Sequence, residues 1–233
     1  MKMPKPLVLL PGMLGDHTVW SAVTALLDVD IELHYGRIDL DNDIGSVARS
    51  VLEAAPATFS LAGHSLGAIV ALEILRQAPH RVVRLASLNA SAMGPTSDQR
   101  ASWSALRERV VSGGFASIAS SFARASLAPS RRMDEGLTAH GELMAGRVGA
   151  EGLLRQLAVQ QSRPDYRADL ADIRVTTIVI GGHLDELATE ARQLELAAGI
   201  AGSRLVTLTG CGHMSPIERP DAVARAFKRW LAR

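Results

Sequence analysis

The pentapeptide Gly-His-Ser-Leu-Gly at residues 63–67 holds the side chain with the clearest chemical meaning, the hydroxyl of Ser65. A serine between two glycines, at a sharp turn from strand to helix, is typical of a nucleophile held clear of a sheet. The amino terminus of the following helix would favour an oxyanion. The letters alone occur by chance in many chains, but here an apolar run, residues 59–62, precedes them. We predict that Ser65 is the nucleophile of an acyl-transfer reaction.

A serine hydroxyl is a weak nucleophile at neutral pH, so it needs a base for its proton and an acid that orients the base. Of the seven histidines, His213 is the best base, because it follows the apolar run 204–208 in a glycine-bearing loop. Asp185 is the predicted acid, since it lies in the loop after the run 176–180. The order serine, acid, histidine is one that known hydrolases use. A helix-capping role for Asp185 stays open, with Glu186 as the substitute acid.

The oxyanion formed by such an attack needs two backbone N–H donors, one after the nucleophile and one from the loop after the first strand. Leu66 supplies the first donor. Met13, in the loop 11–15, is the predicted second donor, and Gly12 would let this loop pass close to the serine. The alternative for the loop is a plain glycine turn before a helix capped by Asp16.

Other side chains near these groups are candidates for contact with the substrate. Apolar residues at helical spacing are more often core than pocket, and a histidine inside a turn more often packs or caps. Arg124 and Arg147 would suit a substrate carboxylate, although a solvated surface arginine is the commoner case. The residues predicted to bind substrate are Gly12, His64, Trp103, Phe122 and Met214.

The scaffold for these residues is predicted by short apolar runs that alternate with helix-period stretches. Such alternation is typical of βαβ units and a parallel sheet. We therefore predict an α/β protein with a mostly parallel six-stranded sheet and helices on both faces. The clearest amphipathic helices cover residues 44–55 and 220–231. The predicted strands cover residues 7–10, 31–38, 59–62, 82–88, 176–180 and 204–208.

The alternation stops between about residues 91 and 163, where helix-period pieces follow one another. One glycine pair (113–114), Pro129 and Gly149 separate these pieces, as expected for helix-breaking residues. We predict a helical cap at residues 91–163, inserted in an α/β core made of residues 1–90 and 164–233, all within one structural domain. Two of the pieces cover residues 99–111 and about 135–146. The second piece holds Phe115, Ile118, Ala119 and Phe122, and the last holds Leu153, Leu154 and Leu157.

The composition limits the class of protein and its partners. The 233 residues, 47% hydrophobic and 21% charged, fit one globular α/β domain. A formal net charge of +1 gives no field that gathers nucleic acid, so none is expected as a partner. The first apolar run is too short for a signal peptide or a membrane span, which predicts a cytoplasmic protein without a membrane partner. The oligomeric state stays open between monomer and homodimer.

Cys211 is the only cysteine of the chain. It lies two residues before His213, which raises the alternatives of a thiol nucleophile or a metal site. A metal site needs three or four ligands, and no other pair of cysteine and histidine has ligand spacing. We predict neither a metal nor a cofactor.

Together with the loops 9–16, 182–185 and 210–220, the serine pentapeptide resembles the α/β-hydrolase superfamily, in particular its compact bacterial esterase-like members. The resemblance spans nearly the whole chain. It implies a sheet covered on both faces, a helical cap before the acid, no cofactor, and hydrolysis through an acyl-enzyme. Two features depart from the family pattern: Pro11 stands where many relatives carry histidine, and the usual proline after the acid is absent.

The predicted function is hydrolysis of a carboxylic ester of a small molecule by Ser65, His213 and Asp185. The same three residue types serve thioesterases, lactonases, C–C hydrolases and lyases, which stay open as alternatives. In another class, the chain could be a small-molecule receptor that keeps these residues without turnover.

Overall fold

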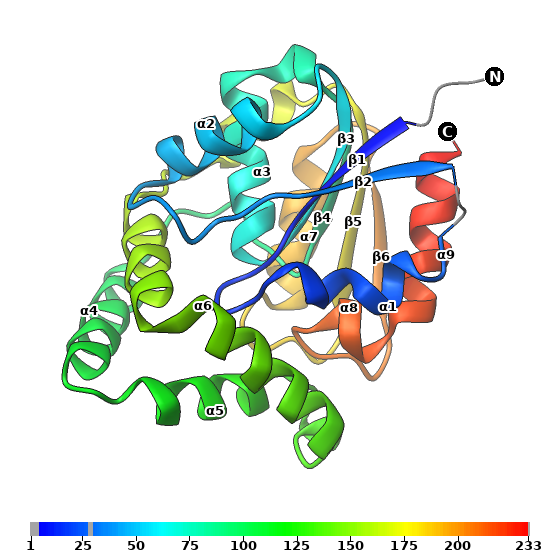
Figure 1. Ribbon diagram of the computed structural model, residues 1–233. Coiled ribbons are helices and arrows are strands. Elements are labelled where there is room, and N and C mark those ends of the chain that lie inside the picture. Colours follow the sequence, from blue (N-terminus) through cyan, green and yellow to red (C-terminus); the bar gives the residue numbers. More distant parts are fainter. Residues whose placement is uncertain (1–4, 28–29, 233) are drawn as a thin grey trace.

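The computed structural model describes residues 5–27 and 30–232, and within them six strands form one sheet (Figure 1). The strand order is β2-β1-β3-β4-β5-β6, and every neighbouring pair is parallel. The prediction of a six-stranded α/β protein is confirmed, and the sheet is fully parallel. The strands are β1 (Lys5–Leu10), β2 (Ile31–Tyr35), β3 (Phe59–His64), β4 (Val82–Leu88), β5 (Thr176–Gly182) and β6 (Arg204–Leu208).

The sheet has an apolar cluster on each face, because successive side chains of a strand point to opposite sides. In β1, Leu7 and Leu9 join one cluster, and Val8 and Leu10 join the other. All residues of β3 are buried, as expected for a strand covered on both faces. Since all strands are parallel, their carboxyl ends meet at one edge of the sheet, where the predicted site residues follow them.

Helices cover both faces of the sheet, as predicted (Figure 1). One cluster takes side chains from α2 (Ile44–Ala54), α3 (Leu66–Gln77) and α7 (Glu190–Gly199). The other takes side chains from α1 (Ser21–Thr24), α8 (Ser215–Glu218) and α9 (Pro220–Leu231). Short 3₁₀ turns lie at His17–Trp20, Pro79–Arg81 and Arg167–Asp172, and the first and the last of them add buried side chains to the core.

The second strand is shorter than the predicted run 31–38. Its pairing with β1 ends where Leu9 lies beside Tyr35, and the amide of Gly36 then donates to the carbonyl of Leu9. Ile38 is still buried, but it packs in the core from a loop. The apolar run therefore predicted the burial of Ile38 correctly, but it placed the end of the strand three residues too late.

The segment between β4 and β5 is helical and contains α4 (Ser97–Val111), α5 (Phe115–Ala125) and α6 (Glu135–Ser162), followed along the chain by β5. A 3₁₀ turn, Pro129–Arg131, joins α5 to α6. The predicted separation of two helical pieces at Gly149 is confirmed, because the backbone there is not helical (φ 72°, ψ 175°) and α6 consists of two helices joined across this kink. The division into core and cap at residues 91 and 163 stays a prediction.

The three helices of this segment pack together through a third apolar cluster, which also includes Leu14 from the loop after β1. Met13 of the same loop packs against it. Figure 1 shows α4, α5 and α6 grouped at one end of the sheet. Among the described residues, no helix combines the length and the apolar character that crossing a membrane requires.

Candidate active site

Ser65 lies at the sharp turn between β3 and α3, with φ 53° and ψ −118°. Such a backbone costs about 1–3 kcal/mol and persists only where the surroundings enforce it. The flanking glycines explain how the turn is possible. A Cβ at Gly63 would lie 2.4 Å from the backbone of Gly67, and one at Gly67 would lie 2.3 Å from the carbonyl of Pro11. The turn thus depends on glycine at both positions.

The side chains of Ser65, His213 and Asp185 form a continuous chain of hydrogen bonds. The Oγ of Ser65 lies 2.8 Å from Nε2 of His213. On the other side of the ring, Nδ1 of His213 lies 2.9 Å from Oδ2 and 3.0 Å from Oδ1 of Asp185. A carboxylate only accepts, so Nδ1 carries the proton and Nε2 is left to accept the hydroxyl proton. This is the protonation pattern that a general base requires.

Asp185 is buried and stays ionised because several donors face it. Burial raises the pKa of this carboxyl, but His213 and the hydrogen bonds from the Ala188 amide and Asn89 outweigh burial, so the net pKa is below its usual value. Its Oδ1 also accepts from the amides of Leu187 and Ala188, at 2.9 and 2.8 Å. The helix α7 begins later and its N-cap is Thr189, so Asp185 orders the loop before that helix.

Glu186, the substitute acid, points elsewhere. Its side chain is 63% exposed and forms an ion pair with Arg132 at 2.8 Å. The structure therefore brings Asp185, and not its neighbour, to the imidazole of His213.

Asn89 is a member of the site that the sequence did not reveal. It follows β4, has φ 50°, and donates from Nδ2 to Oδ2 of Asp185 at 2.9 Å and to the carbonyl of Gly212 at 3.2 Å. Its Oδ1 accepts from the hydroxyl of Ser215 at 2.5 Å. Asn89 thus connects the loop of the acid to the loop of the histidine. An asparagine at the end of a strand beside the serine strand was the available signal.

Glu218 holds the histidine loop to the helical segment above it. Its buried carboxylate accepts from the amides of Gly212, Met214 and Ala128 at 3.0 to 3.2 Å. In addition, the amide of His213 donates to the carbonyl of Ser126 at 2.9 Å. The position of the His213 backbone therefore depends on the segment after α5.

Met13, in the loop after β1, lines the same cavity as Ser65. Leu14 has φ 57°, and its amide donates to Oε1 of the buried Gln156 from α6 at 2.9 Å. This leaves Met13 and Leu66 as the candidates for the oxyanion donors. Leu66 is the first residue of α3, where an amide has no acceptor within the helix.

Backbone strain concentrates at this site. Among the described residues, the non-glycine residues with positive φ are Leu14, Ser65 and Asn89. They follow or lie near the ends of three adjacent strands, β1, β3 and β4. Strained backbone of this kind clusters at functional sites.

A cavity of about 280 Å³ opens at Ser65 and His213. Of the residues predicted to bind substrate, Trp103 and Phe122 line it, as does Met13. Met214 instead borders a separate small cavity of about 20 Å³. The remaining lining residues are Ile69, Asn89, Ala90, Ser91, Gln99, Leu106, Gln160, Arg163, Leu187, Ala188 and Arg192.

Gly12 and His64 do not line this cavity. The backbone of Gly12 lies against Ser65 and the ring of His64, which brings the loop close to the serine. His64 is buried, and its Nε2 lies 2.8 Å from the carbonyl oxygen of His213. Since a carbonyl only accepts, Nε2 carries the proton and His64 is a neutral brace for the backbone of His213. His64 was predicted to contact substrate, but in the structure it supports the backbone of His213 instead.

The other candidate groups lie apart from the serine. Arg147 pairs with Asp16, and Arg124 is exposed on α5. The thiol of Cys211 is buried, and burial raises its pKa far above the usual range, which disfavours a thiolate nucleophile.

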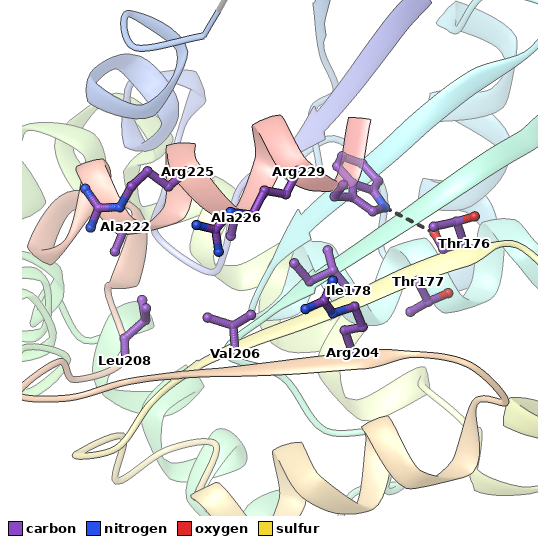
Figure 2. A pocket seen from close by; sticks show the side chains of 11 residues that line it. Thr176, Thr177, Ile178, Arg204, Val206, Leu208, Ala222, Arg225, Ala226 and Arg229 are labelled. Atoms are coloured by element: carbon purple, nitrogen blue, oxygen red, sulfur yellow. Dashed lines mark hydrogen bonds between the residues drawn. The ribbon is translucent and has the colours of Figure 1, made fainter. Parts of the chain in front are cut away.

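A second cavity, of about 240 Å³, lies between α9 and the strands β5 and β6 (Figure 2). Arg225 and Arg229 line it from α9, and Arg204 lines it from β6, the strand that also carries Val206. Arg225 is engaged by a carboxylate of its own helix. None of the three hydrogen-bonded residues, serine, histidine or aspartate, lines this cavity, so it is separate from the candidate active site.

The burial of His64 predicts a measurable pH dependence of stability. Burial lowers the pKa of His64 to about 3 from 6.5. The unfolded chain therefore binds a proton at this residue below pH 6.5, whereas the folded protein binds it only near pH 3, and acid favours unfolding. Between pH 7 and pH 5, urea unfolding should show wild type losing about 2 kcal/mol more than the His64→Gln variant.

The His64→Gln change keeps a donor near the carbonyl of His213 and removes the titrating group. The matched control is His80→Gln, at an exposed histidine, which should leave the wild-type pH slope in place. Equal slopes for wild type and His64→Gln would contradict the assignment of His64 as a buried neutral ring.

Comparison with known sequences connects this geometry to hydrolases. The chain matches the profile of the alpha/beta hydrolase family over residues 7–226. It is 29% identical to pimeloyl-[acyl-carrier protein] methyl ester esterase of Aromatoleum aromaticum, over 94% of both chains. It is also 30% identical to a 2-hydroxy-6-oxononadienedioate/2-hydroxy-6-oxononatrienedioate hydrolase of Escherichia coli, over 39% of this chain and 32% of that protein.

Solved structures share the fold at low sequence identity. A thermophilic esterase from Thermogutta terrifontis superposes with a TM-score of 0.89 at 22% identity, over 99% of this chain and 90% of that one. The enol-lactonase from Burkholderia xenovorans gives a TM-score of 0.85 at 20% identity, over 99% and 92%. These likenesses concern the fold.

Proposed function

Because the chain belongs to the alpha/beta hydrolase family, we propose that it hydrolyses carboxylic esters of small molecules, with Ser65 as nucleophile, His213 as general base and Asp185 as the acid. The observation that carries this proposal is the pair of contacts on His213, 2.8 Å to Ser65 and 2.9 Å to Asp185. The curated relative from Aromatoleum aromaticum is named as a methyl ester esterase, which agrees with ester chemistry.

In the first half of the reaction, the Oγ of Ser65 attacks the ester carbonyl while its proton passes to Nε2 of His213. The amides of Met13 and Leu66 stabilise the oxyanion of the tetrahedral intermediate. The buried Asp185 stabilises the imidazolium that forms. His213 then returns the proton to the alcohol oxygen, the bond from carbon to that oxygen breaks, and the acyl group stays on Ser65.

In the second half, water enters the cavity and gives a proton to His213 as it attacks the acyl carbon. The same amides hold the second oxyanion. When this intermediate collapses, the bond to Ser65 breaks, Oγ recovers its proton from His213, and the carboxylic acid leaves. No group other than protein side chains, amides and water takes part in these steps.

The test is a panel of matched substrates: p-nitrophenyl butyrate, an S-butyryl thioester and γ-butyrolactone. We expect p-nitrophenol release to continue through many turnovers and kcat/KM to be highest for the oxyester. A higher kcat/KM for the thioester or the lactone would reassign the bond that is cleaved. A burst of one equivalent without further turnover would indicate a receptor that keeps the residues of a hydrolase.

A further inference from the structure

Two arginines are among the residues that line the cavity at Ser65. Arg163, the residue after α6, lines the cavity although it is only 7% exposed. Arg192, on α7, is half-buried and lines the same cavity. Two arginines therefore line the same cavity as Ser65 and His213.

The charge of Arg163 has no counter-ion among the described residues. Its Nη1 donates to the neutral Oε1 of Gln160 at 2.7 Å, and its Cζ lies 5.3 Å from the ring centroid of Trp103. The buried Nε has no hydrogen-bond partner. Burial, followed by the charges of Arg192 and Arg100, lowers the pKa of Arg163 to about 10, so the group remains a cation at neutral pH.

The carboxylates that follow Arg163 and Arg192 most closely along the chain form ion pairs with another arginine. Asp165 and Glu195 both pair with Arg167, at 2.6 and 3.5 Å. Within residues 5–27 and 30–232, no carboxylate forms an ion pair with Arg163 or Arg192. A buried cation is unfavourable unless it is paired. The missing anion is thus best supplied by a molecule that enters the cavity.

We propose that Arg163, assisted by Arg192, binds a carboxylate of the substrate, so that the preferred substrates are monoesters of dicarboxylic acids. This inference rests on the proposed esterase function and names the substrate class of the same site. The planar fork of a guanidinium matches a carboxylate and also stacks on an aromatic face, which here is Trp103. Held at that end, the substrate would present its ester group to Ser65.

The first experiment compares charged and uncharged esters of the same shape. The monomethyl esters of succinate, glutarate and adipate cover three lengths, and each is paired with the corresponding methyl ester in which the free carboxylate is a primary amide. For the best length, kcat/KM of wild type should favour the carboxylate by about 10- to 100-fold. Equal kcat/KM for the two members of all three pairs would overturn the proposal.

The second experiment uses variants. Arg163→Met should abolish the preference for the carboxylate, because kcat/KM for the carboxylate ester should fall at least about tenfold more than kcat/KM for the amide ester. Arg192→Gln should weaken the preference to a smaller extent. The matched control is Arg109→Gln, which removes an exposed arginine of α4 that does not line the cavity. If Arg163→Met lowered kcat/KM for both esters equally, the residue would have a packing role only, and the proposal would be wrong.

The third experiment measures binding without turnover. Titration of the Ser65→Ala variant with free glutarate should show saturable binding, and glutaramide should bind at least about tenfold more weakly. Binding of glutarate by a protein that hydrolyses no ester would overturn the proposed function and keep the anion subsite. If the protein hydrolyses neutral esters but binds glutarate no better than glutaramide, the proposed function stands and the proposed anion subsite is wrong. This outcome does not depend on whether the Arg163→Met variant folds.

Discussion

Replacing Ser65 by alanine is expected to lower kcat for p-nitrophenyl butyrate by about 10⁴- to 10⁶-fold, because the reaction loses its nucleophile and proceeds only by direct attack of water. The oxyanion donors Met13 and Leu66 remain, so the residual rate should exceed that of the uncatalysed reaction. Steady-state measurements with purified protein give kcat of wild type, and single-turnover measurements give the residual rate of the variant.

The matched control for this variant is Ser102→Ala, at an exposed serine of α4, which should retain wild-type kcat. Circular dichroism and the thermal midpoint establish that the Ser65→Ala variant is folded. Retention of more than a few per cent of wild-type kcat by this variant would mean that another group performs the attack.

Replacing Asp185 by asparagine should lower kcat by about 10³- to 10⁴-fold, since the amide no longer holds His213 in the tautomer that accepts from Ser65. The side chain keeps its size, so the cavity keeps its shape. The side-chain NH₂ group of the new asparagine would also face hydrogen-bond donors, because the Asp185 carboxylate accepts from Asn89 and from the backbone amide of Ala188. We therefore expect a loss of stability together with the loss of rate.

Glu186→Gln provides the control for Asp185→Asn, because it makes the same chemical change one residue further along the chain. Its side chain is exposed and pairs with Arg132, so kcat should stay within about threefold of wild type. A larger loss in Glu186→Gln than in Asp185→Asn would identify Glu186 as the acid. The two variants together decide between the acids that the sequence left open.

The parts of the site that could be predicted are those with local signatures. The glycines around Ser65 are required by backbone contacts of less than 2.5 Å that a Cβ would make, and this requirement is written into the pentapeptide. The loops of Asp185 and His213 could be placed because each follows an apolar run that forms a parallel strand. Parallel strands end at one edge, so the order of the loops along the chain was enough to bring them together.

The parts that could not be predicted depend on contacts between distant segments. Gln156 supports the amide of Leu14 across 142 positions of sequence, and Asn89 reaches Asp185 across 96. Gln156 has no neighbouring motif that distinguishes it from an ordinary polar side chain, and the signal at Asn89 is only its position at the end of the strand beside the serine strand. Arg163 was missed for a similar reason, because its lack of a counter-ion is visible only once the surrounding carboxylates are placed.

Helix boundaries in the segment above the sheet show a further limit of local patterns. Gly149 breaks the helical backbone, as its position in the sequence suggested, but the chain resumes the helix beyond it. Packing of Leu153 and Leu157 into the cluster that contains Leu14 stabilises the second half of α6. Local propensity predicted the break at Gly149, and tertiary packing stabilises the helix that continues beyond it to Ser162.

The most direct test of the proposed nucleophile is covalent labelling with a fluorophosphonate, followed by intact mass and peptide analysis. We predict one adduct per chain, located on Ser65, with loss of p-nitrophenyl butyrate hydrolysis in proportion to labelling and no adduct on the Ser65→Ala variant. Full activity without an adduct, or an adduct on a different residue that abolishes activity, would contradict the assignment of Ser65 as the nucleophile.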